Sequence, residues 1–83
     1  MSYFVYVLIN PQHHIYIGQT NNVELRLIRH NEGLVRSTAS YRPWKILFTE
    51  EYVSRSEAMT REKQLKSGKG REFIHKEVKR LAN

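Results

Sequence analysis

The stretches Phe4-Val5-Tyr6 and Tyr16-Ile17-Gly18 decide the fold we expect, because β-branched and aromatic residues favour strands. Between them, Asn10-Pro11-Gln12-His13 has the composition of a turn, so an antiparallel hairpin is predicted. In any register whose paired residue numbers have an even sum, Tyr6 and Tyr16 lie on the same face of the sheet. Two interpretations are open: two adjacent phenols can carry out chemistry, or they stabilise the sheet as a cross-strand aromatic pair.

The length and composition predict a single domain spanning residues 1–83, since the chain has 83 residues of which 40% are hydrophobic. There is no cysteine, which excludes disulfides and thiolate zinc sites, and we expect a cytoplasmic protein. The longest apolar run, Tyr3 to Ile9, is too short to span a bilayer and lacks the flanks of a signal peptide, so no membrane association is expected.

The charge is strongly positive, with a formal net charge of +6. Nine of the 14 Lys and Arg residues lie from Arg55 onward. A polyanionic partner such as a nucleic acid is favoured, because neutralising phosphates releases condensed counterions.

Beyond the hairpin, Asn21 is placed to cap a helix that runs to about residue 32, and Gly33 suits a left-handed position after its end. Residues 35–43 are expected to form a loop. Residues 44–53 are predicted to form a third strand, with Ile46 and Phe48 on one face and Leu47 on the other, which favours a central position in the sheet.

Two further helices are predicted in the C-terminal third of the chain. Ser54-Arg55-Ser56-Glu57 has the pattern of a capping box, opening a helix that ends near residues 67–68. Gly70 is expected to separate it from a final helix, in which apolar residues recur at helical spacing. The predicted order of elements is β-β-α-β-α-α.

Arg26 and His30 are four residues apart on the first helix, so they share a face and can reach the same ligand. A solvated polar stripe explains the same spacing. Glu62 is placed on the apolar face of its helix by Ala58 and Leu65. A desolvated carboxylate needs a partner, which is either a basic side chain, Lys66 or Arg26, or a Mg²⁺ ion.

Together these residues resemble the GIY-YIG nuclease domain, and in particular its short, stand-alone members. The resemblance rests on the two tyrosine tripeptides separated by nine residues, on Arg26 and His30, and on the segment from Glu57 to Lys66. It implies an α+β fold with a small three-stranded antiparallel sheet flanked by three helices. It also implies a metal-dependent endonuclease site on one face of that sheet, using Mg²⁺ or Mn²⁺.

Carried over position by position, the resemblance gives the catalytic residues Tyr6, Tyr16, Arg26, His30 and Glu62, with Glu62 as the metal ligand. Gly18 is expected to leave room for a phosphate. Two positions depart from the family pattern: Phe4 and Val5 replace Gly and Ile, and Gln19 stands where several active members have lysine.

The expected function is hydrolysis of DNA phosphodiester bonds, directed by DNA structure such as branches or nicks, in DNA repair. We expect a monomer that depends on a protein partner for targeting. The alternative, suggested by Gln19, is a nucleic-acid-binding or adaptor module with a weak or inactive site. Expected nucleic-acid contacts are Gly18, Gln19, Arg36, Thr38, Tyr41, Arg42, Lys63, Lys66, Lys69 and Arg71.

Three catalytic roles are expected within the site. Arg26 contacts a non-bridging phosphate oxygen. Tyr16 touches the attacking water or its proton path, supported by Tyr6. His30 takes the proton either directly or through a tyrosine, and the sequence leaves both routes open.

Overall fold

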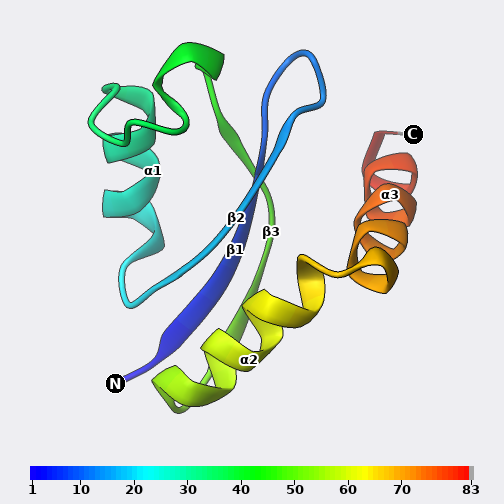
Figure 1. Cartoon of the computed structure of the whole chain (residues 1–83). Coiled ribbons are helices and arrows are strands. Elements are labelled where there is room, and N and C mark those ends of the chain that lie inside the picture. Colours follow the sequence, from blue (N-terminus) through cyan, green and yellow to red (C-terminus); the bar gives the residue numbers. More distant parts are fainter. Residues whose placement is uncertain (83) are drawn as a thin grey trace.

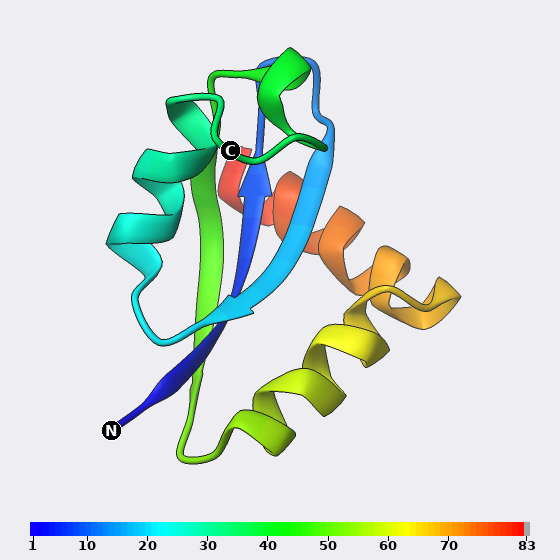
Figure 2. The ribbon, with the colours of Figure 1, turned by 60° about the vertical axis from the view of Figure 1, so that its left-hand side comes forward.

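The computed structural model describes residues 1–82 and confirms the predicted order of elements and the α+β class. The elements are β1 (Tyr3–Ile9), β2 (Ile15–Thr20), α1 (Val23–Asn31), a short 3-10 helix (Ala39–Tyr41), β3 (Lys45–Tyr52), α2 (Arg55–Leu65) and α3 (Gly68–Ala82). The three strands form one antiparallel sheet in the order β2-β1-β3. The helix α1 lies on one side of the sheet, and α2 and α3 lie on the other (Figures 1 and 2).

The strand β1 is the centre of the sheet, and its side chains build a core on each face. Val5 and Val7, both 0% exposed, pack with Ala58 and Leu65 of α2. Tyr6 and Leu8 point to the opposite face, where they pack with Trp44 and with residues of α1. The prediction of a central third strand was wrong, because β3 pairs with β1 alone and forms an edge of the sheet.

A β-bulge in β3 explains why its sequence is apolar on both sides. Val7 pairs with Phe48 and Leu8 pairs with Ile46, so Leu47 is an extra residue in the ladder. Leu47 and Phe48 both pack against the core below α2 and α3. The strict alternation that placed Ile46 and Phe48 on one face is therefore broken, and no second neighbouring strand is needed to cover Leu47.

The boundaries of α1 follow local capping chemistry. Asn22, rather than Asn21, is the N-cap residue, and its side-chain oxygen accepts a hydrogen bond of 3.0 Å from the backbone N–H of Leu25. At the other end Gly33 has φ +79°, as predicted for a left-handed position, and the N–H of Leu34 donates to the carbonyl of Arg29. This is a Schellman ending, which fixes where the chain leaves α1.

The two C-terminal helices meet more closely than the sequence suggested. Ser54 caps α2 as predicted, with its hydroxyl accepting from the backbone N–H of Glu57 at 3.2 Å. However, Gly70 does not separate the helices, because α3 already begins at Gly68. A Cβ atom on Gly70 would collide with the carbonyl oxygens of Gln64 and Leu65. Gly70 is thus required for the tight packing of α3 against the end of α2.

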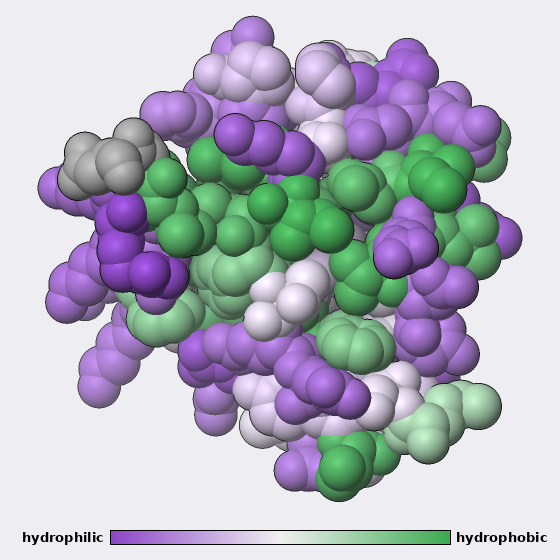
Figure 3. Space-filling view, turned by 180° about the vertical axis from the view of Figure 1, so that it is seen from behind, coloured by the Kyte–Doolittle hydropathy of each residue, from purple (hydrophilic) through white to green (hydrophobic). Residues whose placement is uncertain are grey.

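The small core leaves apolar side chains at the surface. Seen from behind, apolar side chains gather across the middle of the molecule (Figure 3). The half-exposed Ile46 and Leu81 line one surface hollow together. Most apolar surface of this kind is ordinary for a protein of this size. Within residues 1–82, no helix has the length and apolar character needed to cross a membrane.

Candidate active site

The two motif tyrosines lie side by side on the face of the sheet that α1 covers. Tyr6 pairs with Gly18 and Leu8 pairs with Tyr16, so the register has an even sum, which places both tyrosines on one face. Their ring centroids are 6.0 Å apart. Tyr6 is only 1% exposed, whereas Tyr16 is half-buried. Of the two phenols, Tyr16 is therefore the one that a substrate can reach.

The imidazole of His30, on the last turn of α1, lies directly against this pair. Its Nε2 atom is 3.0 Å from the hydroxyl of Tyr6, and its ring centroid is 4.6 Å from that of Tyr16. On the other side, Nδ1 is 2.8 Å from Oγ1 of Thr38. His30 is 0% exposed and Thr38 is 2% exposed. A buried chain of hydrogen bonds thus connects Thr38, His30 and Tyr6.

The surroundings of Thr38 fix the tautomer of His30. The Thr38 hydroxyl has one hydrogen, and it lies in position to donate to the carbonyl of Val35 at 3.3 Å. Nδ1–H of His30 then donates to the Thr38 oxygen, and Nε2 is left as an acceptor for the Tyr6 hydroxyl. We therefore assign the proton of the neutral ring to Nδ1. In this tautomer, Tyr6 donates its proton toward His30.

Trp44 and Asn31 hold the loop that carries Thr38 against α1. The indole Nε1–H of Trp44 donates to the carbonyl of Thr38 at 3.0 Å. The side chain of Asn31 accepts from the backbone N–H of Trp44 at 2.6 Å and donates to its carbonyl at 2.9 Å. The sequence did not predict these supporting roles, because no local pattern shows which residues after α1 will hydrogen-bond back to it.

Burial and neighbouring charges shift the proton affinities of this cluster in opposite directions. Burial raises the pKa of Tyr6 far above its ordinary value of 10.0, and the adjacent phenol of Tyr16 raises it further. Arg26 opposes this rise, while the carboxylate of Glu62 adds to it. Burial lowers the pKa of His30 below 6.5, and Arg26 lowers it further. Arg26 and Glu62 thus act on the same buried phenol, although they come from different helices.

Gly18 makes room for the side chain of Tyr6, and its expected role beside a phosphate stays a prediction. A Cβ atom at this position would lie 2.6 Å from the hydroxyl of Tyr6. Real Cβ atoms do not approach an oxygen so closely, so the ring of Tyr6 occupies the space that the missing side chain leaves. The glycine of the second tripeptide therefore allows Tyr6 to lie across β2 and reach His30.

Glu62 is placed as predicted, between the buried residues Ala58 and Leu65 of α2, with its side chain 23% exposed. Its Oε2 atom accepts a hydrogen bond of 2.7 Å from Lys66, one of the two basic partners expected. Within residues 1–82, no cluster of three or more His, Asp or Glu residues could enclose a metal. A single carboxylate with a free Oε1 fits Mg²⁺, which takes one or two carboxylates and completes its shell with waters and phosphate oxygens.

The neighbouring residue of the same segment, Arg61, has a structural role. Its guanidinium forms a forked pair with Glu50 of β3, with Nε–Oε1 at 2.8 Å and Nη2–Oε2 at 3.2 Å. Tyr52 also donates to Glu50, at 3.0 Å. This network ties α2 to β3 and thereby helps to fix the position of Glu62.

The expected nucleic-acid contacts fall into three groups. Seven side chains are exposed in the loop after α1 or around the turn between α2 and α3: Arg36, Tyr41, Arg42, Lys63, Lys66, Lys69 and Arg71. Gly18 and Thr38 are buried. Because the Thr38 hydroxyl is also hydrogen-bonded to His30, it is not available to a nucleic acid. Gln19 is half-buried, and its Oε1 atom is buried without a hydrogen-bond partner.

A hollow of about 430 Å³ lies between Tyr16 and the basic side chains at the turn between α2 and α3. Tyr16 lines it together with Lys66 and Arg71, above an apolar floor that includes Ile15 and Ile74. The half-exposed phenol of Tyr16 therefore opens toward basic side chains at the turn between α2 and α3.

Comparisons with known proteins agree with this geometry. A family model of the GIY-YIG catalytic domain matches residues 2–76. A UPF0213 protein of Staphylococcus haemolyticus is 36% identical over 67 residues, covering 80% of this chain and 82% of the relative. A UPF0213 protein of Natronomonas pharaonis is 38% identical over 67 residues, covering 80% and 79%.

A solved structure shares the fold. The solution NMR structure of the UPF0213 protein BH0048 from Bacillus halodurans aligns with a TM-score of 0.56 at 28% identity, covering 92% of this chain and 84% of that one. The family match over residues 2–76 includes the whole tyrosine hairpin described above. This chain belongs to the GIY-YIG family of nucleases and is a relative of the UPF0213 proteins.

Proposed function

We propose that this protein is a DNA endonuclease that hydrolyses phosphodiester bonds with the help of one divalent cation, Mg²⁺ or Mn²⁺, held by Glu62. The observation that carries the proposal is the buried hydrogen bond between Tyr6 and His30 beside the half-exposed Tyr16. Arg26 and Glu62 both act on the pKa of Tyr6, so both charges lie near this buried phenol. A cross-strand aromatic pair with only a structural role needs neither of these charges.

Two side chains have direct roles at the phosphate. Arg26 binds a non-bridging oxygen, because its rigid guanidinium fork matches the geometry of a phosphate. Tyr16 orients the attacking water, since its phenol is the more exposed of the two. A cation bound to Glu62 would supply Lewis-acid stabilisation of the phosphate oxygens.

The proton of the attacking water leaves through the buried cluster. His30 cannot contact bulk water, because its side chain is 0% exposed, so the relayed route is favoured over the direct one. Tyr16 takes up the proton of the water as it passes its own to Tyr6, and Tyr6 passes its own to the Nε2 atom of His30, which ends protonated. The lowered pKa of His30 keeps its ring neutral at pH 7 and hence available as an acceptor.

DNA binds across the half-exposed Tyr16 and along the hollow lined by Lys66 and Arg71. Lys63 and Lys69 extend this basic surface around the turn between α2 and α3. The exposed positive charges contact phosphates, which carry no sequence information. We therefore infer recognition of DNA structure, such as branches or nicks, with a protein partner supplying further targeting.

The test is nicking of a supercoiled plasmid with Mg²⁺ or Mn²⁺. Glu62→Gln, which keeps the shape of the side chain, is expected to abolish the metal-dependent nicking while leaving DNA binding intact. Arg26→Ala is expected to weaken nicking by at least two orders of magnitude, as loss of a preorganised charge contact does. Robust nicking by Glu62→Gln would rule out the metal role, and unchanged nicking by Arg26→Ala would rule out the phosphate role.

A second candidate function is a nucleic-acid-binding or adaptor module with little turnover. The ion pair between Lys66 and Glu62 and the neutral Gln19 favour it, because one occupies the carboxylate and the other removes a charge near the site. Lys66→Met separates the two functions. DNA affinity should fall in either case, since Lys66 lines the basic hollow. In a nuclease this variant frees Glu62 and retains nicking at saturating protein, whereas in a binding module cleavage stays absent.

A further inference from the structure

A second hollow lies beside Arg26, at the junction between β2 and α1. It has a volume of about 310 Å³ and is lined by residues 19–22, Leu25, Arg26, Arg29 and Arg55. Arg26 belongs to the proposed active site, but Arg29 and Arg55 have no role in it. Three arginines from two helices therefore surround one hollow that adjoins the active site.

These arginines lack carboxylate partners. The ion pairs within residues 1–82 join Arg61 to Glu50, Lys66 to Glu62 and Arg80 to Glu77, so none includes an arginine of the hollow. The guanidinium of Arg55 lies 5.7 Å from the ring centroid of Tyr3, a cation–π contact that holds the side chain without using its hydrogen-bond donors. Like charges around one hollow repel each other, and a bound anion relieves this repulsion.

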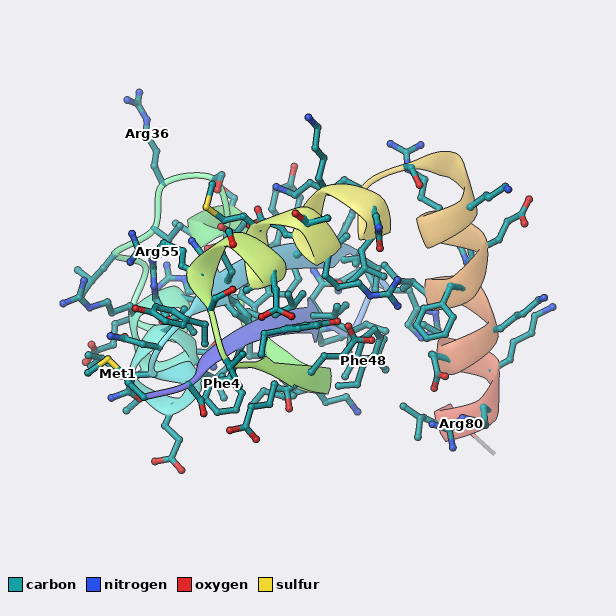
Figure 4. The ribbon with its side chains drawn as sticks, turned by 90° about the horizontal axis from the view of Figure 1, so that it is seen from below. Met1, Phe4, Arg36, Phe48, Arg55 and Arg80 are labelled. Atoms are coloured by element: carbon teal, nitrogen blue, oxygen red, sulfur yellow. The ribbon has the colours of Figure 1, made fainter. Side chains whose placement is uncertain are left out.

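The arrangement of these charges in the molecule is uneven. Figure 4 places Arg36 and Arg55 toward one end and Arg80 at the other. The charges of the hollow thus form a feature distinct from the C-terminal helix α3, which carries its own exposed Lys79 and Arg80. This separation provides an internal control for any measurement of charge effects.

We propose that this hollow is a second phosphate subsite, in which Arg29 and Arg55 bind the backbone phosphate adjacent to the one that Arg26 holds for hydrolysis. The inference rests on the proposed function for the identity of its occupant. Guanidinium forks suit phosphate oxygens, and a nucleic acid presents a second phosphate beside every scissile one. Arg26 lies between the two phosphates and is shared by them.

The subsite extends the contact with the bound strand beyond the active site. One phosphate occupies the hollow at Arg29 and Arg55, the next lies at Arg26 and Tyr16, and the strand continues toward Lys66 and Arg71. Arg29 and Arg55 therefore help to position the strand for cleavage at the phosphate that Arg26 holds.

The first test needs neither DNA nor cleavage. Inorganic phosphate is titrated into the ¹⁵N-labelled protein, with chloride at equal ionic strength as the reference. We expect saturable shifts at the amides of residues 19–22 and at the Nε–H groups of Arg29 and Arg55. The double variant Arg29→Ala/Arg55→Ala should lose them, whereas the charge-matched control Lys79→Ala/Arg80→Ala should keep them. Shifts that persist in the first double variant, or that occur only around residues 66–71, would overturn the subsite.

The second test measures how the affinity for duplex DNA depends on salt, in the cleavage-deficient Glu62→Gln background. Each phosphate contact contributes a slope of about 0.9 in log affinity against log salt. Arg29→Ala/Arg55→Ala should reduce the slope by about one contact, and Lys79→Ala/Arg80→Ala should not. If the slope is unchanged while the wild-type protein cleaves DNA, the subsite fails and the nuclease stands. If phosphate binds as predicted but no DNA is cleaved, the proposed function fails and the anion site stands.

Discussion

The hydroxyl of Tyr6 lies 3.0 Å from Nε2 of His30, and neither side chain is more than 1% exposed. The hydrogen bond is shielded from water and joins a strand to a helix 24 residues later in the chain. A buried polar pair of this kind is costly unless each atom has a partner, and the cluster meets that requirement through Thr38.

Thr38→Val removes the oxygen that accepts from Nδ1 of His30 while conserving the shape of the side chain. Leaving that buried donor without a partner should lower the free energy of unfolding by about 1–3 kcal/mol and shift the ring proton to Nε2. The nicking rate should fall, because Tyr6 then faces a donor instead of an acceptor. The tautomer is measured from the ¹⁵N shifts of His30, and Thr38→Ser should restore both readouts. If Thr38 only fills space, Thr38→Ser and Thr38→Val should leave His30 in the same tautomer.

The pH dependence of stability should show the buried His30. Since its pKa is lowered, the unfolded chain takes up a proton before the folded protein does. His30 therefore contributes stability at pH values above 6.5, and this contribution is lost as the pH falls below 6.5 toward the lowered pKa. Urea unfolding between pH 7.5 and 5 measures the loss. His30→Gln should flatten the dependence, whereas His75→Gln on the exposed face of α3 should not.

Gly18→Ala should disturb Tyr6, because the added Cβ would lie 2.6 Å from its hydroxyl. We expect a loss of about 1–3 kcal/mol in the free energy of unfolding, together with lower nicking activity. Combining Gly18→Ala with Tyr6→Leu tests the cause, since leucine leaves the space empty. The two changes should then be coupled, and the double variant should be less destabilised than the sum of the single effects. Strict additivity would show that Gly18 has another role.

The Glu50–Arg61 pair should stabilise the fold at neutral pH and lose this contribution when Glu50 is protonated in acid. Burial alone would raise the pKa of Glu50, but hydrogen bonds from Arg61 and Tyr52 outweigh it and lower the pKa below 4.5. This stability is present above pH 4.5 and lost as the pH falls through the lowered value. Glu50→Gln should reduce the loss measured by urea unfolding below pH 4.5. The side chains are about a quarter exposed, so the effect should be on the order of 1 kcal/mol.

The sequence predicted the hairpin and the limits of α1 to within one or two residues because these depend on local chemistry, whereas the even register of the hairpin was a condition that only the structure supplied. Alternating residues indicate a strand from its own sequence, and a glycine such as Gly33 indicates the left-handed backbone that ends a helix. The edge position of β3 was not predictable in the same way. Its apolar residues on both faces are also typical of a central strand, and only the bulge at Leu47 explains them.

Within the candidate site, the tyrosines, Arg26 and His30 were recognised from spacing and from the family resemblance. The roles of Thr38 and Gly18 were not, since each depends on the position of a side chain remote in sequence. Thr38 was expected to face a nucleic acid but is buried and bonds His30, and Gly18 makes room for the side chain of Tyr6. Contacts of this kind arise from tertiary packing and leave no local pattern.

The central claim is that Tyr16 acts at the scissile phosphate, and Tyr16→Phe tests it most directly. The variant removes one hydroxyl and keeps the ring against His30. Nicking of supercoiled plasmid with Mg²⁺ should fall by about 10²–10⁴-fold, the usual contribution of a positioned acid or base, while DNA affinity stays within about twofold of the wild type. A variant that nicks as fast as the wild type, or a wild-type protein that nicks no branched, nicked or linear substrate, would contradict the account.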